Sequence, residues 1–126
     1  MWLVNGRAAL HLDREILAGV YDSLRVCQPF KRWRLPPASD LTLRVMRYTS
    51  HEGHYTRVVG TQKHEIGVSA ARISHFDSLA IVMAHEMIHL HQALAKLETR
   101  GEHNADFRRR AARVCKVLGF DPRLFC

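Results

Sequence analysis

The chain has 126 residues, of which 47% are hydrophobic and 25% charged, and its formal net charge is +7. This length fits one domain, residues 1–126, with a modest core, and the composition is that of an ordinary globular protein with no stretch resembling a membrane span. The basic excess favours nucleic acid or an acidic surface as a partner, and a merely solubilising surface is the alternative.

The cysteines and the N-terminal segment indicate the cellular compartment of the protein. Cys27, Cys115 and Cys126 stand at scattered spacings without a CxxC pair, so neither a disulfide framework nor a cysteine zinc ribbon is indicated. Residues 1–12 are too short and too polar for a convincing signal peptide. We therefore expect a cytoplasmic protein without a membrane partner, nucleoid-associated if it binds DNA, and leave its oligomeric state open.

The first predicted element is a helix that begins after Asp13, a residue well suited to capping it. Apolar residues then recur at helical spacing, namely Ile16, Leu17, Val20 and Leu24. Gln28-Pro29 ends this helix, and residues 36–40 have the composition of a loop.

Three strands are expected next. Residues 41–45 alternate apolar and polar side chains, which is the period of a half-buried strand. A second strand is expected over 54–59 and a third over 64–69, joined by a turn at 60–63. Together they predict a small, mostly antiparallel sheet built by hairpin connection.

Two further helices complete the chain. The stronger covers residues 79–97, with Asp77 or Ser78 as its cap, and residues 98–102 interrupt the pattern. Asn104 then caps a last helix that runs through Val117 and stops at Gly119. The predicted fold class is therefore α+β.

The stronger helix carries the sequence HEMIH over residues 85–89, an HExxH motif. On a helical wheel His89 lies about 40° from His85 and Glu86 about 100° from it. The two imidazoles thus stand one turn apart on one face, where both can reach a single Zn²⁺. Most of the remaining circumference is apolar, so two histidines and a carboxylate would be buried together at a cost that a divalent cation removes.

This arrangement predicts hydrolytic chemistry. Zinc lowers the pKa of its bound water to about 7. Glu86 can take the proton as that water attacks a carbonyl and then pass it to the leaving amine. The alternative is a hydrogen-bonded His-Glu-His cluster without metal.

A catalytic zinc usually has three protein ligands, so a third is needed. His103 is the best candidate, because it lies just before the last helix, which would fold back beside the motif. Glu98 and Glu102 are its competitors. His91 lies about 240° round the wheel and is expected to be a core or supporting residue.

These residues resemble the SprT-like metalloproteases, the zincin family that includes Spartan. The matching segments are residues 85–89 and Gly101-Glu102-His103-Asn104-Ala105-Asp106-Phe107, within a resemblance that covers Leu41 to Leu118. It implies a zincin-like minimal domain with His103 as the third ligand and Phe107 as the anchor of the last helix. It also implies that Ile66–Ser69 form an edge strand able to pair with substrate. Proteins bound or crosslinked to DNA are the substrates that it implies.

Two basic segments and three possible oxyanion-stabilising residues stay open as hypotheses. Arg108, Arg109, Arg110, Arg113 and Lys116 make the last helix basic, which indicates either a DNA contact or a solvated face. Residues 31–34 combine charge with Trp33, as single-strand binders do, although packing also explains the tryptophan. An oxyanion-stabilising residue is sought among His51, His54 and Tyr55.

The expected function is zinc-dependent cleavage of a protein or peptide substrate, with metal ligands His85, His89 and His103 and with Glu86 as general base and acid. Two alternatives remain. One is a basic DNA-binding or regulatory module with a structural zinc. The other is a phage or mobile-element zincin that acts on one host protein.

Overall fold

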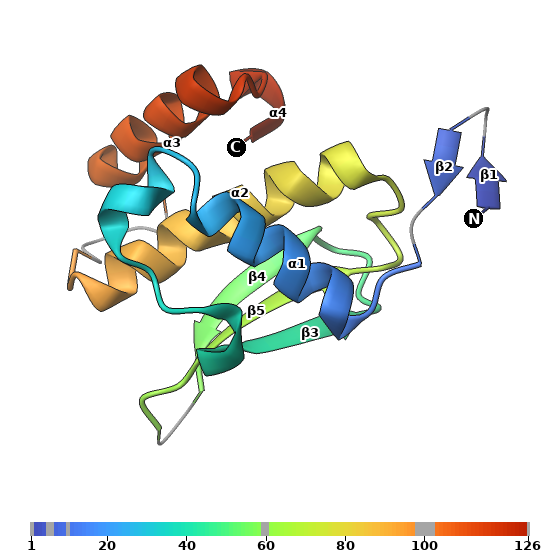
Figure 1. The fold of residues 1–126 in the computed structure, drawn as a ribbon, viewed down its shortest axis with the longest axis horizontal. Helices are drawn as coiled ribbons and strands as arrows, with labels where there is room; N and C mark the ends of the chain where they lie inside the picture. Colours follow the sequence, from blue (N-terminus) through green and yellow to red (C-terminus); the bar gives the residue numbers. More distant parts are fainter. Residues whose placement is uncertain (1, 5–6, 10, 59–60, 98–102, 126) are drawn as a thin grey trace.

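The computed structural model describes residues 2–4, 7–9, 11–58, 61–97 and 103–125, and it confirms the predicted α+β class. Helices α1 (Arg14–Arg25) and α2 (Phe76–Leu94) pack against one face of a three-stranded sheet. Helices α3 (Ala105–Leu118) and α4 (Pro122–Phe125) pack in turn on α2, as Figure 1 shows. Among the described residues, no helix has the length and apolar character needed to cross a membrane.

The sheet is mixed, which corrects the expectation of hairpin connections throughout. Strand β5 (His64–Ser69) lies between β3 (Thr42–Met46) and β4 (Gly53–Arg57). The predicted hairpin between β4 and β5 is antiparallel, but β3 pairs with β5 in parallel, with Leu43 opposite Ile66. Because β5 is the most buried of the three strands, it takes the central position, with a hydrogen-bonded neighbour on each side.

Helix α1 begins where the sequence predicts. The Asp13 side chain accepts a hydrogen bond from the Ile16 backbone N–H at 2.8 Å. The helix buries Leu17, Val20 and Tyr21 against α2 and β3. It ends at Arg25, before the Gln28-Pro29 pair that was expected to stop it.

Helix α2 starts and ends about three residues earlier than predicted. Its N-cap is His75, and Asp77 accepts a hydrogen bond from the next residue's N–H instead of capping the helix. At the other end Lys96 adopts a left-handed backbone conformation (φ 57°), and the Leu97 N–H donates to the Gln92 carbonyl at 2.8 Å. This termination uses no glycine, so no sequence signal marks it.

Helix α3 has the predicted boundaries to within one residue. Asn104 caps it by accepting from the Phe107 N–H, and Gly119 ends it with a left-handed φ of 78°. The short helix α4 follows and was not expected. The sequence also did not reveal the hairpin β1 (Trp2–Val4) and β2 (Arg7–Ala9), or the 3₁₀ helices η1 (Phe30–Trp33) and η2 (Ala38–Asp40).

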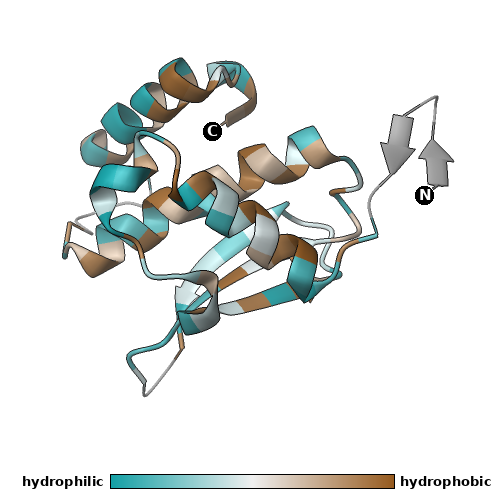
Figure 2. Cartoon of the chain, viewed as in Figure 1, coloured by the Kyte–Doolittle hydropathy of each residue, from teal (hydrophilic) through white to brown (hydrophobic). Residues whose placement is uncertain are grey.

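A hydrophobic cluster of described residues fills the space between the helices and the sheet. Its largest fully buried side chains come from α1, η1, β5, α2 and α3: Tyr21, Phe30, Phe107, Leu17, Ile66, Leu79, Met83, Met87, Ile88, Leu90, Val68 and Val114. Figure 2 shows that η1 and the first turns of α3 also carry hydrophilic residues, beside the buried Phe30 and Phe107. The cluster fixes α2 against the sheet, and α2 carries the HExxH motif.

Candidate metal centre

Helix α2 presents His85 and His89 one turn apart. The centroids of their rings are 5.1 Å apart, as helical spacing requires. Glu86 projects from the same turn and is only 6% exposed. The remaining circumference is packed in the core, so the helix cannot rotate these side chains away without exposing Met83, Met87 and Leu90.

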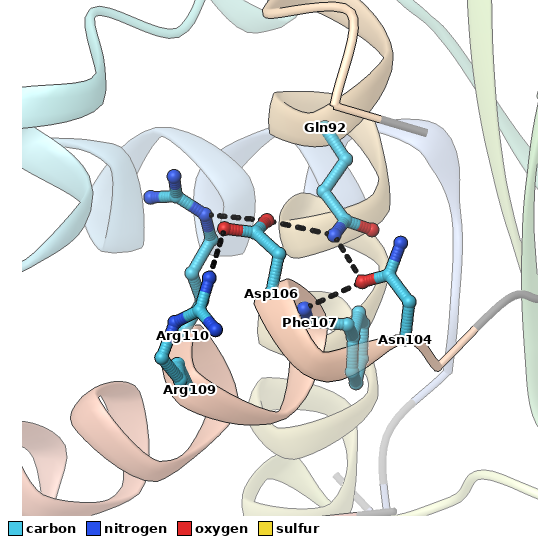
Figure 3. Close-up of polar contacts among 6 residues, drawn as sticks. All are labelled: Gln92, Asn104, Asp106, Phe107, Arg109 and Arg110. Carbon is cyan, nitrogen blue, oxygen red and sulfur yellow. Dashed lines mark hydrogen bonds and ion pairs between the residues drawn. The ribbon is translucent and has the colours of Figure 1, made fainter. Parts of the chain in front are cut away.

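His103 reaches the same place because the start of α3 is fastened to α2. The buried Gln92 amide donates to the Asn104 side-chain oxygen at 3.1 Å and to the Asp106 carboxylate at 2.9 Å (Figure 3). The Arg108 guanidinium donates to the His103 carbonyl at 2.7 Å. These bonds set the backbone at residue 103 directly beside the motif helix.

The three imidazoles converge on one point. One nitrogen from each of His85, His89 and His103 lies within 4.8 Å of the other two. The Nε2 atoms of His85 and His103 are 3.1 Å apart. A tetrahedral zinc with bonds of about 2.0–2.1 Å sets neighbouring ligand nitrogens about 3.4 Å apart, close to the separation of this pair, so the three residues suit this metal. Phe107 packs against all three rings, with centroid distances of 4.6–5.0 Å.

The protonation of His85 is fixed by the short helix α4. Its Nδ1–H donates to the carbonyl oxygen of Phe125 at 2.8 Å. The lone pair of Nε2 therefore points into the histidine group, which is the tautomer that a metal ligand requires. This contact joins residues forty positions apart, and a backbone carbonyl leaves no signature in a sequence.

Electrostatics favour a neutral His89 ring. Burial, with the positive charges that His85 and His103 can carry adding to it, lowers the pKa of His89 from 6.5 to about 4. Neutral imidazoles are the form that binds zinc. His89 is therefore in its metal-binding form at neutral pH.

An open cleft of about 1100 Å³ runs beside the histidines. The three histidines, Glu86 and Gln92 line one side, β4 with His51 and Glu52 lines the other, and Leu124 and Phe125 of α4 contribute to the lining as well. Strand β4 is an edge strand whose outer side is not paired by any described residue. Ile66–Ser69, expected to be the edge strand, instead belong to the central strand β5 because their burial calls for neighbours on both sides.

Gly53 of β4 leaves space for the Glu86 carboxylate. A Cβ atom at this position would lie 3.3 Å from Glu86 Oε2 and 2.7 Å from Val82 Cγ1. The strand therefore approaches the helix at the position of the general-base candidate. Sequence reasoning missed Gly53, since a lone glycine at the start of a strand is a weak signal.

The three oxyanion candidates all line the cleft. Tyr48 O–H donates to His54 Nδ1 at 2.7 Å, and His54 Nε2–H donates to Glu65 at 2.9 Å, so both ring nitrogens of His54 are engaged. The Tyr55 hydroxyl is bound to His64 Nδ1 at 2.5 Å. Burial, with Glu86 and Glu65 adding to it, raises the pKa of Tyr48 to about 12, which keeps its hydroxyl a donor.

The remaining candidates lie elsewhere. His91 stacks on Trp33 with ring centroids 4.5 Å apart, away from the three converging histidines, in the supporting role expected for it. Glu98 and Glu102, the competing third ligands, lie outside the described residues, as does Gly101.

A helix-borne HExxH motif, a third histidine just before the following helix and a cleft bordered by an edge strand define a zincin-type, metalloprotease-like domain. The model of the SprT-like family matches residues 25–124, and the chain belongs to this family. A search of curated proteins found no match.

Proposed function

We propose that the protein is a zinc-dependent endopeptidase. The observation that carries this proposal is the convergence of three imidazole nitrogens within 4.8 Å, beside a buried carboxylate and an open cleft. The ligand set offers three donors among the described residues, which leaves the fourth tetrahedral position open, as in catalytic zinc sites. A structural zinc, the rival interpretation, normally has four protein ligands.

The roles of the residues follow from their positions. His85, His89 and His103 would hold the ion. Zinc bound there would supply a Lewis acid for the scissile carbonyl and would lower the pKa of a water molecule. Glu86 accepts a proton from the attacking water and returns it to the leaving amine. Gly53 leaves space beside the Glu86 carboxylate, since a Cβ there would lie 3.3 Å from Oε2.

The substrate that the cleft suits is an extended chain. Backbone groups of β4 can pair with a peptide laid along the cleft, as in β-augmentation. Such pairing contacts the peptide backbone and few side chains, so we propose a protease with broad sequence preference. We also propose that it acts in the cytoplasm. Its substrates are proposed to be DNA-associated proteins at the nucleoid, in keeping with the net charge of +7.

The test separates metal binding from chemistry. Glu86→Gln should retain one zinc per chain yet lose casein cleavage by about a thousandfold or more, because it removes the proton acceptor. His103→Ala should lose both zinc and cleavage. Metal content is measured by atomic absorption and cleavage by release of labelled peptides.

Glu52→Gln is the matched control, since Glu52 also lines the cleft but is 50% exposed and lies 3.7 Å from Arg72 in a surface ion pair. Its cleavage rate should stay within about threefold of wild type. Full cleavage by Glu86→Gln would contradict the proposal, and would instead favour a structural metal.

A further inference from the structure

A second hollow lies away from the cleft, between η1 and the first turns of α3. It is lined by Gln28, Pro29, Arg32, Trp33, Asp106, Arg109, Arg110 and Arg113, and shares no residue with the cleft. The two basic segments that the sequence left as separate hypotheses, one at 31–34 and one in the last helix, therefore meet in one place. We name this hollow the arginine pocket.

Positive charge in the arginine pocket is only partly compensated. Asp106 is the single carboxylate among its lining residues, and it pairs with Arg110 at 3.0 Å and with Arg109 at 3.4 Å (Figure 3). Within the described ranges, no carboxylate lies within 4.0 Å of Arg32 or Arg113, and both residues are exposed. Two guanidinium groups are thus available to an anion from outside.

Trp33 packs against side chains on both sides in this pocket, so its ring has no free face on which a base could stack. His91 stacks on it at 4.5 Å, the ring of Phe30 meets it edge-on at 5.0 Å, and the guanidinium carbon of Arg110 lies 5.3 Å from its centroid. The tryptophan therefore holds Arg110 in position through a cation–π contact. Bases of a nucleic acid would find no unoccupied aromatic platform on Trp33.

We propose that the arginine pocket binds the phosphate groups of a nucleic-acid backbone, without reading base sequence. Guanidinium forks match phosphate oxygens in bidentate geometry. A strand with regularly spaced phosphates can reach Arg32 and Arg113 together while the net charge of +7 attracts it from a distance. A nucleic acid is favoured over an acidic peptide because every nucleotide carries a charged phosphate, whereas a peptide would need a run of acidic side chains. The inference stands independently of the hydrolytic activity.

The experiment measures binding of a labelled oligothymidylate by fluorescence anisotropy, using the full chain at several salt concentrations. Arg32→Gln/Arg113→Gln should weaken binding on the order of tenfold and lower the slope of log K against log salt by about 1.4, because two phosphates are no longer neutralised and each contributes ~0.7. Glu86→Gln alone should bind like wild type, which separates this test from the failure of the proposed protease.

Arg14→Gln/Lys63→Gln is the control, because it removes the same charge at exposed positions outside the pocket. It should change affinity by less than about threefold. Equal weakening by the two double variants would overturn the proposal, since it would show attraction by net charge alone. Competition by polyglutamate as strong as that by unlabelled oligothymidylate would overturn it as well, in favour of an acidic protein partner.

Discussion

At Gly53, strand β4 lies so close to helix α2 that no side chain fits beside Glu86. A side chain there would meet Val82 Cγ1 at 2.7 Å and the Gly67 carbonyl oxygen at 3.0 Å before it reached the carboxylate. The strand or the helix must then shift, and any shift of the helix moves the carboxylate relative to the cleft. The absence of a side chain at this position is therefore part of the proposed catalytic geometry.

Gly53→Ala should accordingly lower kcat by about 10- to 100-fold, because sub-ångström displacement of a proton-transfer group is costly. The free energy of unfolding should fall by about 1–3 kcal/mol from overpacking. Zinc content should remain near one per chain. The readouts are steady-state cleavage, urea unfolding and metal analysis.

Gly19→Ala is a matched control within the same chain. Gly19 lies in α1, and a Cβ there meets nothing within 4 Å. This variant should be as active as wild type and more stable by about 0.5–1 kcal/mol, as expected for alanine in a helix. Unchanged cleavage by Gly53→Ala would contradict the role assigned to this glycine.

At the scale of elements, the first turn of α3 determines where His103 lies. Asn104 serves two partners with one side-chain oxygen, since it accepts from the Phe107 N–H at 2.8 Å and from the Gln92 amide at 3.1 Å. The first bond caps α3, and the second fastens α3 to α2 (Figure 3). A cap that is also a tie between helices should affect both stability and the metal site.

Asn104→Ala should therefore reduce the free energy of unfolding by about 0.5–2 kcal/mol and weaken zinc affinity by about 10- to 100-fold. Asp13→Ala removes the matching cap of α1, whose side chain accepts from Ile16 N–H at 2.8 Å. It should cost similar stability without any change in zinc affinity, measured by competition with a chelating dye. Equal zinc affinities in the two variants would show that the tie to Gln92 does not position His103.

Sequence reasoning was strongest where a signal is local. Asp13 and Asn104 mark helix starts and Gly119 marks a helix end, because capping depends on residues a few positions apart. The spacing of His85 and His89 likewise follows from helical geometry alone. The parallel pairing of β3 with β5 was missed, because alternation indicates a strand but not its neighbour.

The parts of the site that were missed depend on contacts distant in sequence. The bond from His85 to the Phe125 carbonyl involves a backbone atom that every residue type carries. The arginine pocket joins η1 to α3, and neither segment alone shows which side chains turn toward the other. Both features needed the packed structure before they could be recognised.

For the whole molecule, two half-buried histidines, His89 and His91, make stability depend on pH. Burial, with Arg110 adding to it, lowers the pKa of His91 from 6.5 to about 4, and His89 is lowered similarly. The unfolded chain therefore binds protons that the folded protein excludes between about pH 4 and pH 6.5. The stabilisation is complete above pH 6.5 and is lost as the pH falls through this window.

His91→Phe keeps an aromatic ring stacked on Trp33 but removes one of the two imidazoles whose pKa is lowered on folding. In the presence of chelator, its free energy of unfolding should fall less steeply than that of wild type between pH 6.5 and pH 4, as measured by urea denaturation. His11→Phe, at an exposed position before α1, controls for the substitution itself. Parallel curves for His91→Phe and wild type would mean that His91 is not the residue responsible.

The hydrogen bond from His85 to Phe125 also has a thermodynamic consequence. One imidazole faces the histidine group with one nitrogen and holds the carbonyl of α4 with the other. Occupancy of the ligand group and formation of the last helix are then linked equilibria, and each favours the other by the same free energy. Loss of the cation would loosen α4, and displacement of α4 would release the cation more readily.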